Sequence, residues 1–346
     1  MKATIKEVAR EAGVSIATVS RVLNGKDRVK ASTREKIEEA IKKLNFQVDQ
    51  NARSMIKKET RTIGMIVPEL SNEYWSHLFD ALQDHFWGNG YTIIVGTTGR
   101  SLEKEAAILK SFLERRVDGI VFGTALPRPE RDETMDWLSG YSIPAVSLDP
   151  KVKGMHCVVG DHLQGATDAV DHLLRLGRRD VAFIGGPTLP DNRELGYRNA
   201  HLRLGLQVNE ALVRRTSSSA TFQVGYKETK RLLEEKTPFT AVFGYNDAVA
   251  FGAVRALEEA GLRVPQDVAV VGYDDVQMAA MFKPPLTTVR QPVREIGEAL
   301  AQLLLESLAM DPEARRTAPR KNVSFKTELI VRESCGAALM TPATWP

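Results

Sequence analysis

The chain has 346 residues, of which 43% are hydrophobic and 26% charged, and it contains only two cysteines, Cys157 and Cys335. This length accommodates two or three domains, and two cysteines are too few for the disulfide framework of a small secreted protein. The first residues are charged, and no run approaches the roughly 18 apolar residues of a membrane span. We therefore expect a cytoplasmic protein without an export signal or a membrane segment.

The net charge of +3 is unevenly distributed along the chain. Residues 1–60 contain 14 Lys and Arg against 8 Asp and Glu, whereas the remaining residues contain 33 against 36. A basic head on a slightly acidic body is typical of a phosphate-binding module joined to a second domain. The same excess of charge also fits an ordinary solvated face.

The first 46 residues are predicted to form three short helices. Thr4 and Glu7 make a capping box before the first helix, and Ser15 can cap the second. Ser32 and Glu35 are predicted to make another capping box before the third helix. Two such helices joined by a tight turn form either a helix-turn-helix, whose second helix enters the major groove of DNA, or a plain helical hairpin.

Beyond residue 61 the pattern changes to short runs rich in Val and Ile that alternate with longer amphipathic stretches. This alternation predicts parallel sheets covered by helices on both faces, and about 270 residues favour two lobes over one sheet. The predicted strands are Ile63–Val67, Thr92–Val95, Gly119–Phe122, Ala145–Leu148, Val181–Ile184, Ala241–Phe243 and Val268–Val271. The predicted helices are Leu78–Trp87, Glu105–Glu114, Ala166–Leu176 and Val249–Ala260.

Several sequence motifs carry a resemblance to a known family. They are Thr4–Ser15, Ala17–Gly25, Arg61–Gly64, Arg116–Ile120, Gly261–Pro265, Val270–Asp275 and Pro284–Pro292. Together they resemble the LacI/GalR (lactose/galactose repressor) family of transcription regulators over nearly the whole chain, apart from the last dozen residues.

The resemblance implies an α/β protein with an N-terminal helix-turn-helix, a hinge, and a two-lobed domain of parallel sheets like that of periplasmic binding proteins. The implied boundaries are residues 1–46 for the DNA-binding head and 47–61 for the hinge. Residues 62–332 are then the effector-binding and dimerisation domain, in which the chain crosses between lobes near residues 160, 290 and 322. Residues 333–346 form a tail without heptads, so we expect a homodimer and no tetramer.

The family's base-reading positions fall on Ile16, Ala17 and Arg21 of the second helix. Arg21 can donate two hydrogen bonds to guanine O6 and N7, while Ile16 and Ala17 offer apolar contact to a thymine methyl group. The implied phosphate contacts, which set the register on the duplex, are Thr4, Thr18, Ser20 and Asn24. For Thr4 the capping role is a second interpretation, compatible with the first.

The hinge of the family becomes helical on DNA and inserts an apolar side chain into the minor groove. Here Ala52, Arg53 and Met55 match that segment, with Met55 in place of the usual leucine. Val48 stands where the family commonly has proline, which leaves the entry to this helix less rigid. The alternative for Met55 is a linker residue that packs on the protein core.

The implied effector contacts lie just after predicted strands, where ligands bind in open α/β folds. A sugar suits them because Asp, Asn and Arg can bond adjacent hydroxyls while an aromatic ring covers the C–H face. They are Ser71, Tyr74, Trp75, Asp149, Asp161, Arg193, Phe222, Asn246 and Asp274. The alternative is that some of these positions are helix N-caps, and it applies to Asp161, Asn246, Asp247, Asp274 and Asp275.

Two departures from the family leave the effector open. Glu73 stands where proline is frequent, and Ala220 stands where an aromatic is usual, with Phe222 as the nearest substitute. A nucleoside therefore stays an alternative to a sugar, and a protein co-regulator stays an alternative to a metabolite.

The implied function is that of a sequence-specific repressor that binds a pseudo-palindromic operator in double-stranded DNA. We expect no cofactor, no metal and no enzymatic activity, because no Walker A, Gly-x-Ser-x-Gly or His-Glu-x-x-His motif occurs. His162 and His172 lie ten residues apart, out of helical register for joint ligation, and are expected at the surface. A secreted sugar-binding protein would share the lobes, but it would need an export signal and would lack the basic head.

Overall fold

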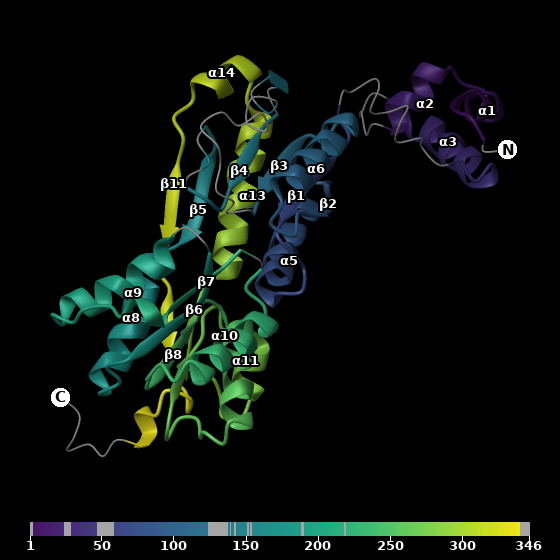
Figure 1. Cartoon of the computed structure of the whole chain (residues 1–346). Helices are drawn as coiled ribbons and strands as arrows, with labels where there is room; N and C mark the ends of the chain where they lie inside the picture. Colours follow the sequence, from purple (N-terminus) through teal and green to yellow (C-terminus); the bar gives the residue numbers. More distant parts are fainter. Residues whose placement is uncertain are drawn as a thin grey trace. The chain divides into compact units, whose positions relative to one another are not determined.

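The computed structural model describes residues 3–23, 29–46, 59–123, 138, 140–141, 143–150, 152, 154–187, 190–217 and 219–339. The chain divides into two compact units, Met1–Thr60 and Arg61–Pro346 (Figure 1). Four positions to which the sequence assigns DNA contacts lie outside the described residues, and they are Asn24, Ala52, Arg53 and Met55.

The head unit contains three helices, α1 (Ile5–Glu11), α2 (Ile16–Leu23) and α3 (Ala31–Lys43). Each helix contributes two buried side chains to one small core, so the three helices fix one another's orientation. The buried core residues are Val8, Ala9, Val19, Val22, Ile37 and Ala40.

Two of the three predicted helix caps of the head are confirmed. The Thr4 amide donates to Glu7 Oε2 at 2.7 Å and the Glu7 amide donates to Thr4 Oγ1 at 3.4 Å, which completes the capping box of α1. Ser15 Oγ accepts from the Thr18 amide at 3.2 Å. The predicted box of Ser32 and Glu35 is wrong: α3 begins earlier, at Ala31, so Ser32 lies inside the helix and the cap position makes no side-chain hydrogen bond.

The first lobe of the second unit is built on a six-stranded parallel sheet in the order β11-β5-β4-β3-β1-β2. Helices α5 (Glu73–Gly88) and α13 (Val293–Ala309) share a core with one face, and α6 (Leu102–Glu114) packs on the other. The strands are β1 (Thr62–Val67), β2 (Thr92–Thr97), β3 (Gly119–Phe122), β4 (Ala145–Ser147), β5 (His156–Gly160) and β11 (Asn322–Phe325).

The second lobe is built on a four-stranded parallel sheet in the order β7-β6-β8-β9. Helices α8 (His162–Arg175) and α9 (Asn192–Arg203) lie on one face, and α10 (Phe222–Glu234) and α11 (Asp247–Glu259) lie on the other (Figure 1). The strands are β6 (Val181–Pro187), β7 (Val213–Thr216), β8 (Ala241–Gly244) and β9 (Ala269–Val271). The short helices of the unit are η1 (Glu210–Leu212), α12 (Gln277–Met281), α14 (Pro312–Thr317) and η2 (Ala337–Leu339).

The chain passes between the two lobes three times. It does so between β5 and α8, between β10 (Thr288–Arg290) and α13, and between β11 and β12 (Glu328–Ile330). Strands β10 and β12 pair antiparallel and form a separate small sheet. The lobes are therefore joined by three segments of the chain rather than by one flexible linker.

The segment after residue 332, which the sequence suggests is a tail, contributes to the core of the second lobe. Ser334 Oγ accepts from the Thr287 amide at 2.8 Å and donates to the Val270 carbonyl at 2.6 Å. The side chain of Cys335 is fully buried in the same lobe. The fold of this lobe is thus completed only by the end of the chain.

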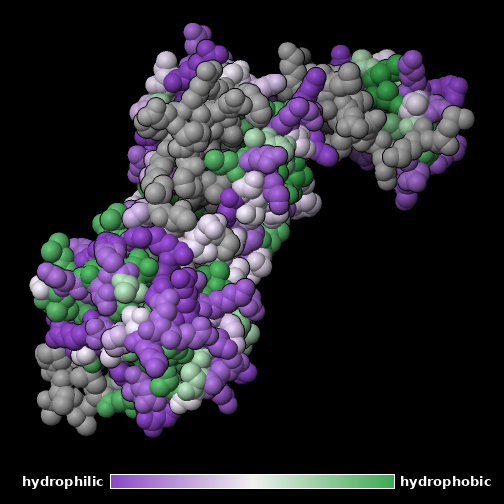
Figure 2. Space-filling model, viewed as in Figure 1, coloured by the Kyte–Doolittle hydropathy of each residue, from purple (hydrophilic) through white to green (hydrophobic). Residues whose placement is uncertain are grey.

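On the coloured part of the viewed face, hydrophilic side chains predominate and hydrophobic ones occur in separate groups (Figure 2). The large apolar side chains of the sheets are buried between helices and strands. Of the helices that the structure describes, none combines the length and the apolar character required to span a bilayer.

Helices α10 and α11 approach each other through two glycines. A Cβ atom on Gly252 would meet the backbone carbonyl of Phe222, and one on Gly225 would meet the backbone of Val249. Backbone atoms cannot move aside as the end of a flexible side chain can, so only glycine allows this close approach.

We expect Gly252→Ala to lower the free energy of unfolding of the second unit by about 2–3 kcal/mol, because the added methyl group forces the two helices apart. Thermal and urea unfolding of the full chain measure this loss. Gly88→Ala, at the exposed C-terminal end of α5 where an added Cβ meets no atom within 4 Å, is the matched control and is expected to be neutral or slightly stabilising. Equal effects of the two substitutions would contradict the packing argument.

Candidate functional site

One face of α2 is exposed and carries the side chains predicted to read DNA bases. Ile16, Ala17 and Arg21 are exposed, whereas Val19 and Val22 on the opposite side of the helix are buried in the head core. Ile16 keeps 44% of its surface exposed, which is unusual for an isoleucine in a small domain. The face thus combines apolar side chains with one guanidinium, which suits contact with base edges in the major groove.

The predicted phosphate contacts of the head lie around α2 and at the start of α1. The Thr18 hydroxyl lies 2.8 Å from Ser15 Oγ and is half-buried, as is Ser20. The Thr4 hydroxyl donates to Glu7 Oε2 at 3.0 Å, so the capping role of this residue is present in the folded head.

The loops that follow β1, β7 and β9 bring the two lobes into contact. Asn72 Nδ2 in the first lobe donates to Asp274 Oδ2 in the second at 3.2 Å. Nearby, the Gln277 amide donates to Glu73 Oε2 at 2.9 Å, and Ser219 Oγ donates to Glu69 Oε2 at 2.8 Å. The carboxyl ends of the two sheets therefore face each other. The inter-lobe junction, as we name it here, comprises Asn72, Asp191, Arg193, Tyr245, Tyr273, Asp274 and Gln291.

Arg193 is the central cation of the inter-lobe junction. Its guanidinium lies over the rings of Tyr245 and Tyr273, with its carbon 4.6 Å and 4.0 Å from the ring centroids. It donates to the Tyr245 carbonyl at 2.5 Å and to Asp274 Oδ1 at 3.2 Å. Burial by itself lowers the pKa of Arg193, but Asp274 and the further negative potential of Tyr245, Tyr273 and Asp191 together hold the pKa above its ordinary value, so the side chain stays charged.

Asp274 is the acceptor on which both lobes converge. Besides Arg193 and Asn72, the amide of Gln291 donates to Asp274 Oδ1 at 2.7 Å. Burial raises the pKa of Asp274, and these three donors oppose the rise. The residue has a φ of 109°, a left-handed conformation that few residues other than glycine adopt and that points to a constrained position.

Capping of a helix N-terminus was the alternative role for Asp161, Asn246, Asp247, Asp274 and Asp275, and two of these five residues are caps. Asp161 Oδ1 accepts from the Gln164 amide and caps α8, and Asn246 Oδ1 accepts from the Val249 amide and caps α11. The remaining three are not caps. Asp247 accepts from Thr288 Oγ1 and the Val276 amide, Asp275 pairs with Arg290 and Arg332, and Asp274 pairs as described above.

The other predicted effector contacts are spread along the same edge of the sheets. Tyr74 is buried at the start of α5 and meets Trp75 edge to face, with ring centroids 5.0 Å apart. Ser71 is exposed in the loop before this helix. Asp149 is buried after β4, and Phe222 opens α10 with 38% of its surface exposed.

The structure adds junction residues that sequence reasoning missed. Gln291 lies within the Pro284–Pro292 motif, and Tyr245 directly precedes Asn246. Asp191 caps α9 and accepts from the Tyr245 hydroxyl at 2.7 Å, so it holds the ring beneath Arg193 in place. The position of Tyr245 directly after a buried strand could have indicated a site residue. The convergence of three hydrogen-bond donors on Asp274 could not be seen in the sequence.

His162 and His172, which the sequence analysis expects at the surface, are both half-buried and contact other side chains. His162 is half-buried and its Nδ1 lies 3.2 Å from the Tyr273 hydroxyl. His172 Nε2 lies 3.3 Å from Cys335 Sγ. Neither imidazole is placed for joint metal ligation with the other.

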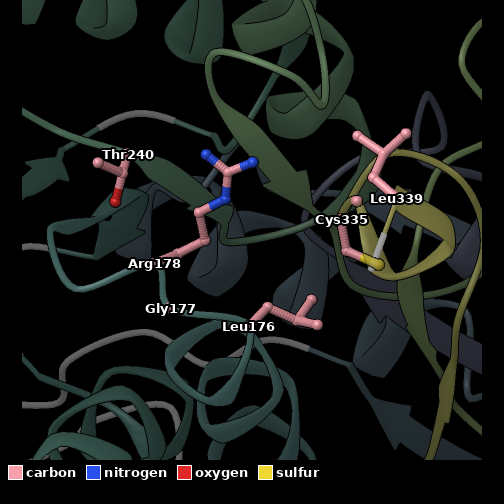
Figure 3. Close-up of a pocket in the computed structure, with 7 residues that line it drawn as sticks. Leu176, Gly177, Arg178, Thr240, Cys335 and Leu339 are labelled. Atoms are coloured by element: carbon pink, nitrogen blue, oxygen red, sulfur yellow. The ribbon is translucent and has the colours of Figure 1, made fainter. Parts of the chain in front are cut away.

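A pocket of about 240 Å³ lies at the amino ends of β6 and β8, at the opposite edge of the second-lobe sheet from the inter-lobe junction. Figure 3 shows Arg178 and Thr240 on one side of it and Cys335 and Leu339 on the other. The Arg178 guanidinium donates to the Pro265 carbonyl at 2.7 Å and so braces a neighbouring loop.

The chemistry of the two sites and the fold define a class of protein. A helix-turn-helix with an exposed reading face is joined to two parallel α/β lobes whose polar groups meet at one junction. Carboxylate, guanidinium and amide groups beside aromatic rings are suited to ligands that carry hydroxyl groups. This combination is that of a DNA-binding regulator with a periplasmic-binding-protein-like domain.

Comparison with known proteins gives the family. The sequence model of bacterial regulatory proteins of the lacI family matches residues 4–49, and that of the periplasmic binding protein-like domain matches residues 170–335. The HTH-type transcriptional regulator DegA of Bacillus subtilis (strain 168) is 32% identical, over 96% of this chain and 98% of that protein. The chain belongs to the lacI family of bacterial transcription regulators, which are not enzymes.

Solved structures agree with this assignment and with the predicted fold class. A Lac repressor dimer bound to operator and the anti-inducer ONPF is 29% identical, with a TM-score of 0.83 over 97% of this chain and 99% of that one. A complex of the transcriptional regulator CelR with cellobiose is 30% identical, with a TM-score of 0.69 over 96% of this chain and 100% of that one.

The half-buried His162, whose imidazole contacts the Tyr273 hydroxyl, is expected to make the stability of the second unit depend on pH. Burial, together with the nearby charge of Arg193, lowers the pKa of His162 from 6.5 to about 3. Between these values the unfolded chain binds a proton that the folded chain does not. Folding is therefore destabilised as the pH falls below 6.5, by up to about 1.4 kcal/mol per pH unit.

Urea unfolding of the full chain at pH 7.0 and pH 5.0 measures this dependence. His162→Asn removes the titrating group and keeps a side chain able to bond the Tyr273 hydroxyl, so the variant should lose less stability at pH 5.0 than the original chain. His77→Asn, at an exposed position of α5, is the control and should follow the original chain. An unchanged pH dependence in His162→Asn would show that the imidazole titrates normally.

Proposed function

We propose that this chain is a repressor that binds a pseudo-palindromic operator as a homodimer and responds to a small-molecule effector, a sugar or sugar derivative, held at the inter-lobe junction. The observation that carries the proposal is the buried Arg193–Asp274 pair, to which Asn72 of the opposite lobe also donates. A ligand bound among these groups contacts both lobes at once, and its binding is thereby linked to their relative position.

For DNA binding, α2 is the proposed recognition helix. Arg21 reads a guanine, and Ile16 and Ala17 make apolar base contacts. The phosphate contacts are Thr4, Thr18, Ser20 and Asn24, and the minor-groove contacts of the hinge are Ala52, Arg53 and Met55. The exposed reading face of α2, opposite its buried face, supports this division of roles.

The proposed organisation assigns residues 1–46 to the DNA-binding head and 47–61 to the hinge. Effector binding and dimerisation are assigned to the unit that begins at residue 62, and its C-terminal bound is extended from 332 to include Ser334 and Cys335, which lie in the core of the second lobe. Dimerisation follows from geometry, because one head reads too short a half-site, and a two-fold protein matches a two-fold operator. The dimeric, operator-bound state of the similar Lac repressor supports it.

On the effector side, Arg193, Asp274, Asp149 and Asn246 are the proposed polar contacts, and Tyr74 and Trp75 are the stacking partners. Ser71, Asp161 and Phe222 complete the set. Asn246 donates one amide hydrogen to the Ala220 carbonyl at 2.9 Å and has a second available. Cellobiose in the similar CelR complex supports a sugar as the class of effector.

We expect Arg21→Ala to weaken operator binding by about 1–3 kcal/mol and to relax specificity at one base pair in each half-site. The measurement is a titration of operator duplexes with every base changed in turn, at fixed salt. Arg34→Ala, in α3 of the same head, removes the same charge away from the reading face and serves as control. Uniform weakening on all sequences by Arg21→Ala would assign Arg21 to phosphate contact instead.

A second pair of variants separates effector binding from DNA binding. Asp274→Asn should abolish the response of operator affinity to effector, while effector-free operator binding stays nearly intact. Met55→Gly, which removes the hinge side chain proposed to enter the minor groove, should do the reverse. Couplings of this type change affinity roughly 5–150-fold. Equal loss of effector-free operator binding in both variants would show that Asp274 is only a structural residue.

A further inference from the structure

The side chain of Arg100, beside the inter-lobe junction, has no partner among the described residues. Arg100 follows β2 in the first lobe, and its backbone amide donates to Thr98 Oγ1 at 3.2 Å. Its Nε atom is buried and makes no hydrogen bond. Across the part of the chain that the structure describes, the guanidinium of Arg100 has neither an ion pair nor a hydrogen-bonding acceptor. A desolvated guanidinium donor without an acceptor is unfavourable unless a ligand supplies one.

The loop that carries Arg100 belongs to the edge of the first lobe that meets the second. The Thr98 amide donates to the Val67 carbonyl at 2.9 Å, and the Gly99 amide donates to the Pro68 carbonyl at 2.8 Å. These bonds attach the loop to the segment that continues to Asn72, which contacts Asp274. The charge of Arg100 also acts on Tyr245 in the second lobe. Burial and Asp191 raise the pKa of the Tyr245 hydroxyl, and the guanidinium groups of Arg193 and Arg100 oppose part of this rise.

The backbone at Arg100 is held in an uncommon conformation. Gly99 and Arg100 have φ values of 56° and 62°, so two consecutive residues lie in the left-handed region. Glycine adopts this region freely, but arginine does so at a cost. The buried hydroxyl of Thr98 keeps the Arg100 amide in place, so the direction of the arginine is set by the loop.

The acidic groups around the junction are already engaged and do not neutralise Arg100. Asp274 accepts from three donors, and Asp191 accepts from the first turn of α9 and from Tyr245. Glu69 and Glu73 accept from Ser219 and the Gln277 amide, and Asp149 also has a partner of its own. Among the acidic groups of the junction that the structure describes, none therefore pairs with Arg100, which leaves its charge available to a bound anion.

A second unsatisfied group at the junction is an acceptor. Gln291 Nε2 donates to Asp274, which fixes the orientation of the amide and leaves Gln291 Oε1 buried without a donor. The buried unsatisfied groups are thus the Nε donor of Arg100 in the first lobe and the Oε1 acceptor of Gln291 at the junction. A ligand that satisfies both has an anionic group and at least one hydroxyl group.

We propose that the effector is a polyhydroxylated anion, with its carboxylate or phosphate bound by Arg100 and a hydroxyl group donating to Gln291 Oε1. The planar guanidinium matches both oxyanions, because each offers two oxygens at suitable spacing. This inference rests on the proposed binding of a small effector at the junction, and it makes Arg100 the residue that selects the charge of that effector.

The test is calorimetric titration of the full chain with matched ligands on ribose, glucose and galactose skeletons. For each skeleton the neutral sugar, its aldonate and its terminal phosphate ester are compared, which separates a carboxylate from a phosphate. We expect one anion to bind about tenfold or more tightly than its neutral parent. Arg100→Gln should remove this preference, Arg100→Lys should keep part of it, and Arg115→Gln, at the exposed far end of α6, should leave it unchanged.

Three results would overturn the proposal: neutral sugars that bind as tightly as their anions, an anion preference that survives Arg100→Gln, or no binding by any anion at millimolar concentration. Operator titrations with the same compounds separate this outcome from failure of the proposed function. Release or strengthening of operator binding by a neutral sugar would uphold the effector function and reject the anion. Thermal unfolding of Arg100→Gln verifies that the variant is folded.

Discussion

The buried ion pair between Arg193 and Asp274 is the interaction on which the inter-lobe junction depends. Removing two charges from water is costly, and a buried pair is tolerated only when its remaining donors and acceptors are satisfied. Here two tyrosine rings cover the guanidinium, a backbone carbonyl accepts from it, and amides from Asn72 and Gln291 complete the carboxylate. Because Asn72 comes from the other lobe, the same interaction that satisfies the charge also sets the distance between the lobes.

The strands and helices that were predictable from the sequence are those with strong apolar patterns. All seven predicted strands and four predicted helices of the second unit are confirmed, with boundaries shifted by a few residues. The missed strand β7 (Val-Arg-Arg-Thr) lies at a sheet edge and is only partly buried, so its pattern is weak. Helix α9 was missed because polar residues dominate it, although Glu194 and His201 are buried in its interior face.

The sequence predicts those features of the site that depend only on where a residue stands relative to a strand. Polar residues after buried strands were correctly expected at one edge of the sheets, because that follows from parallel topology. Which of them are caps depends on the local turn, and Asp161 and Asn246 differ from Asp274 in a way that residue type does not reveal. The contact of Gln291 with Asp274 and the proximity of Arg100 to Tyr245 depend on the packing of different segments of the chain, and no local pattern indicates such contacts.

The order in which the chain builds its lobes has a consequence for synthesis on the ribosome. Strand β11 completes the first-lobe sheet and Ser334 ties together the second lobe, so neither lobe is finished until almost the entire chain has emerged. The head, in contrast, has a core made only of its first 46 residues and can fold at once. A stalled or truncated chain would therefore present a folded reading helix with no regulatory domain behind it, and its unfinished lobes would expose apolar strands to chaperones and proteases.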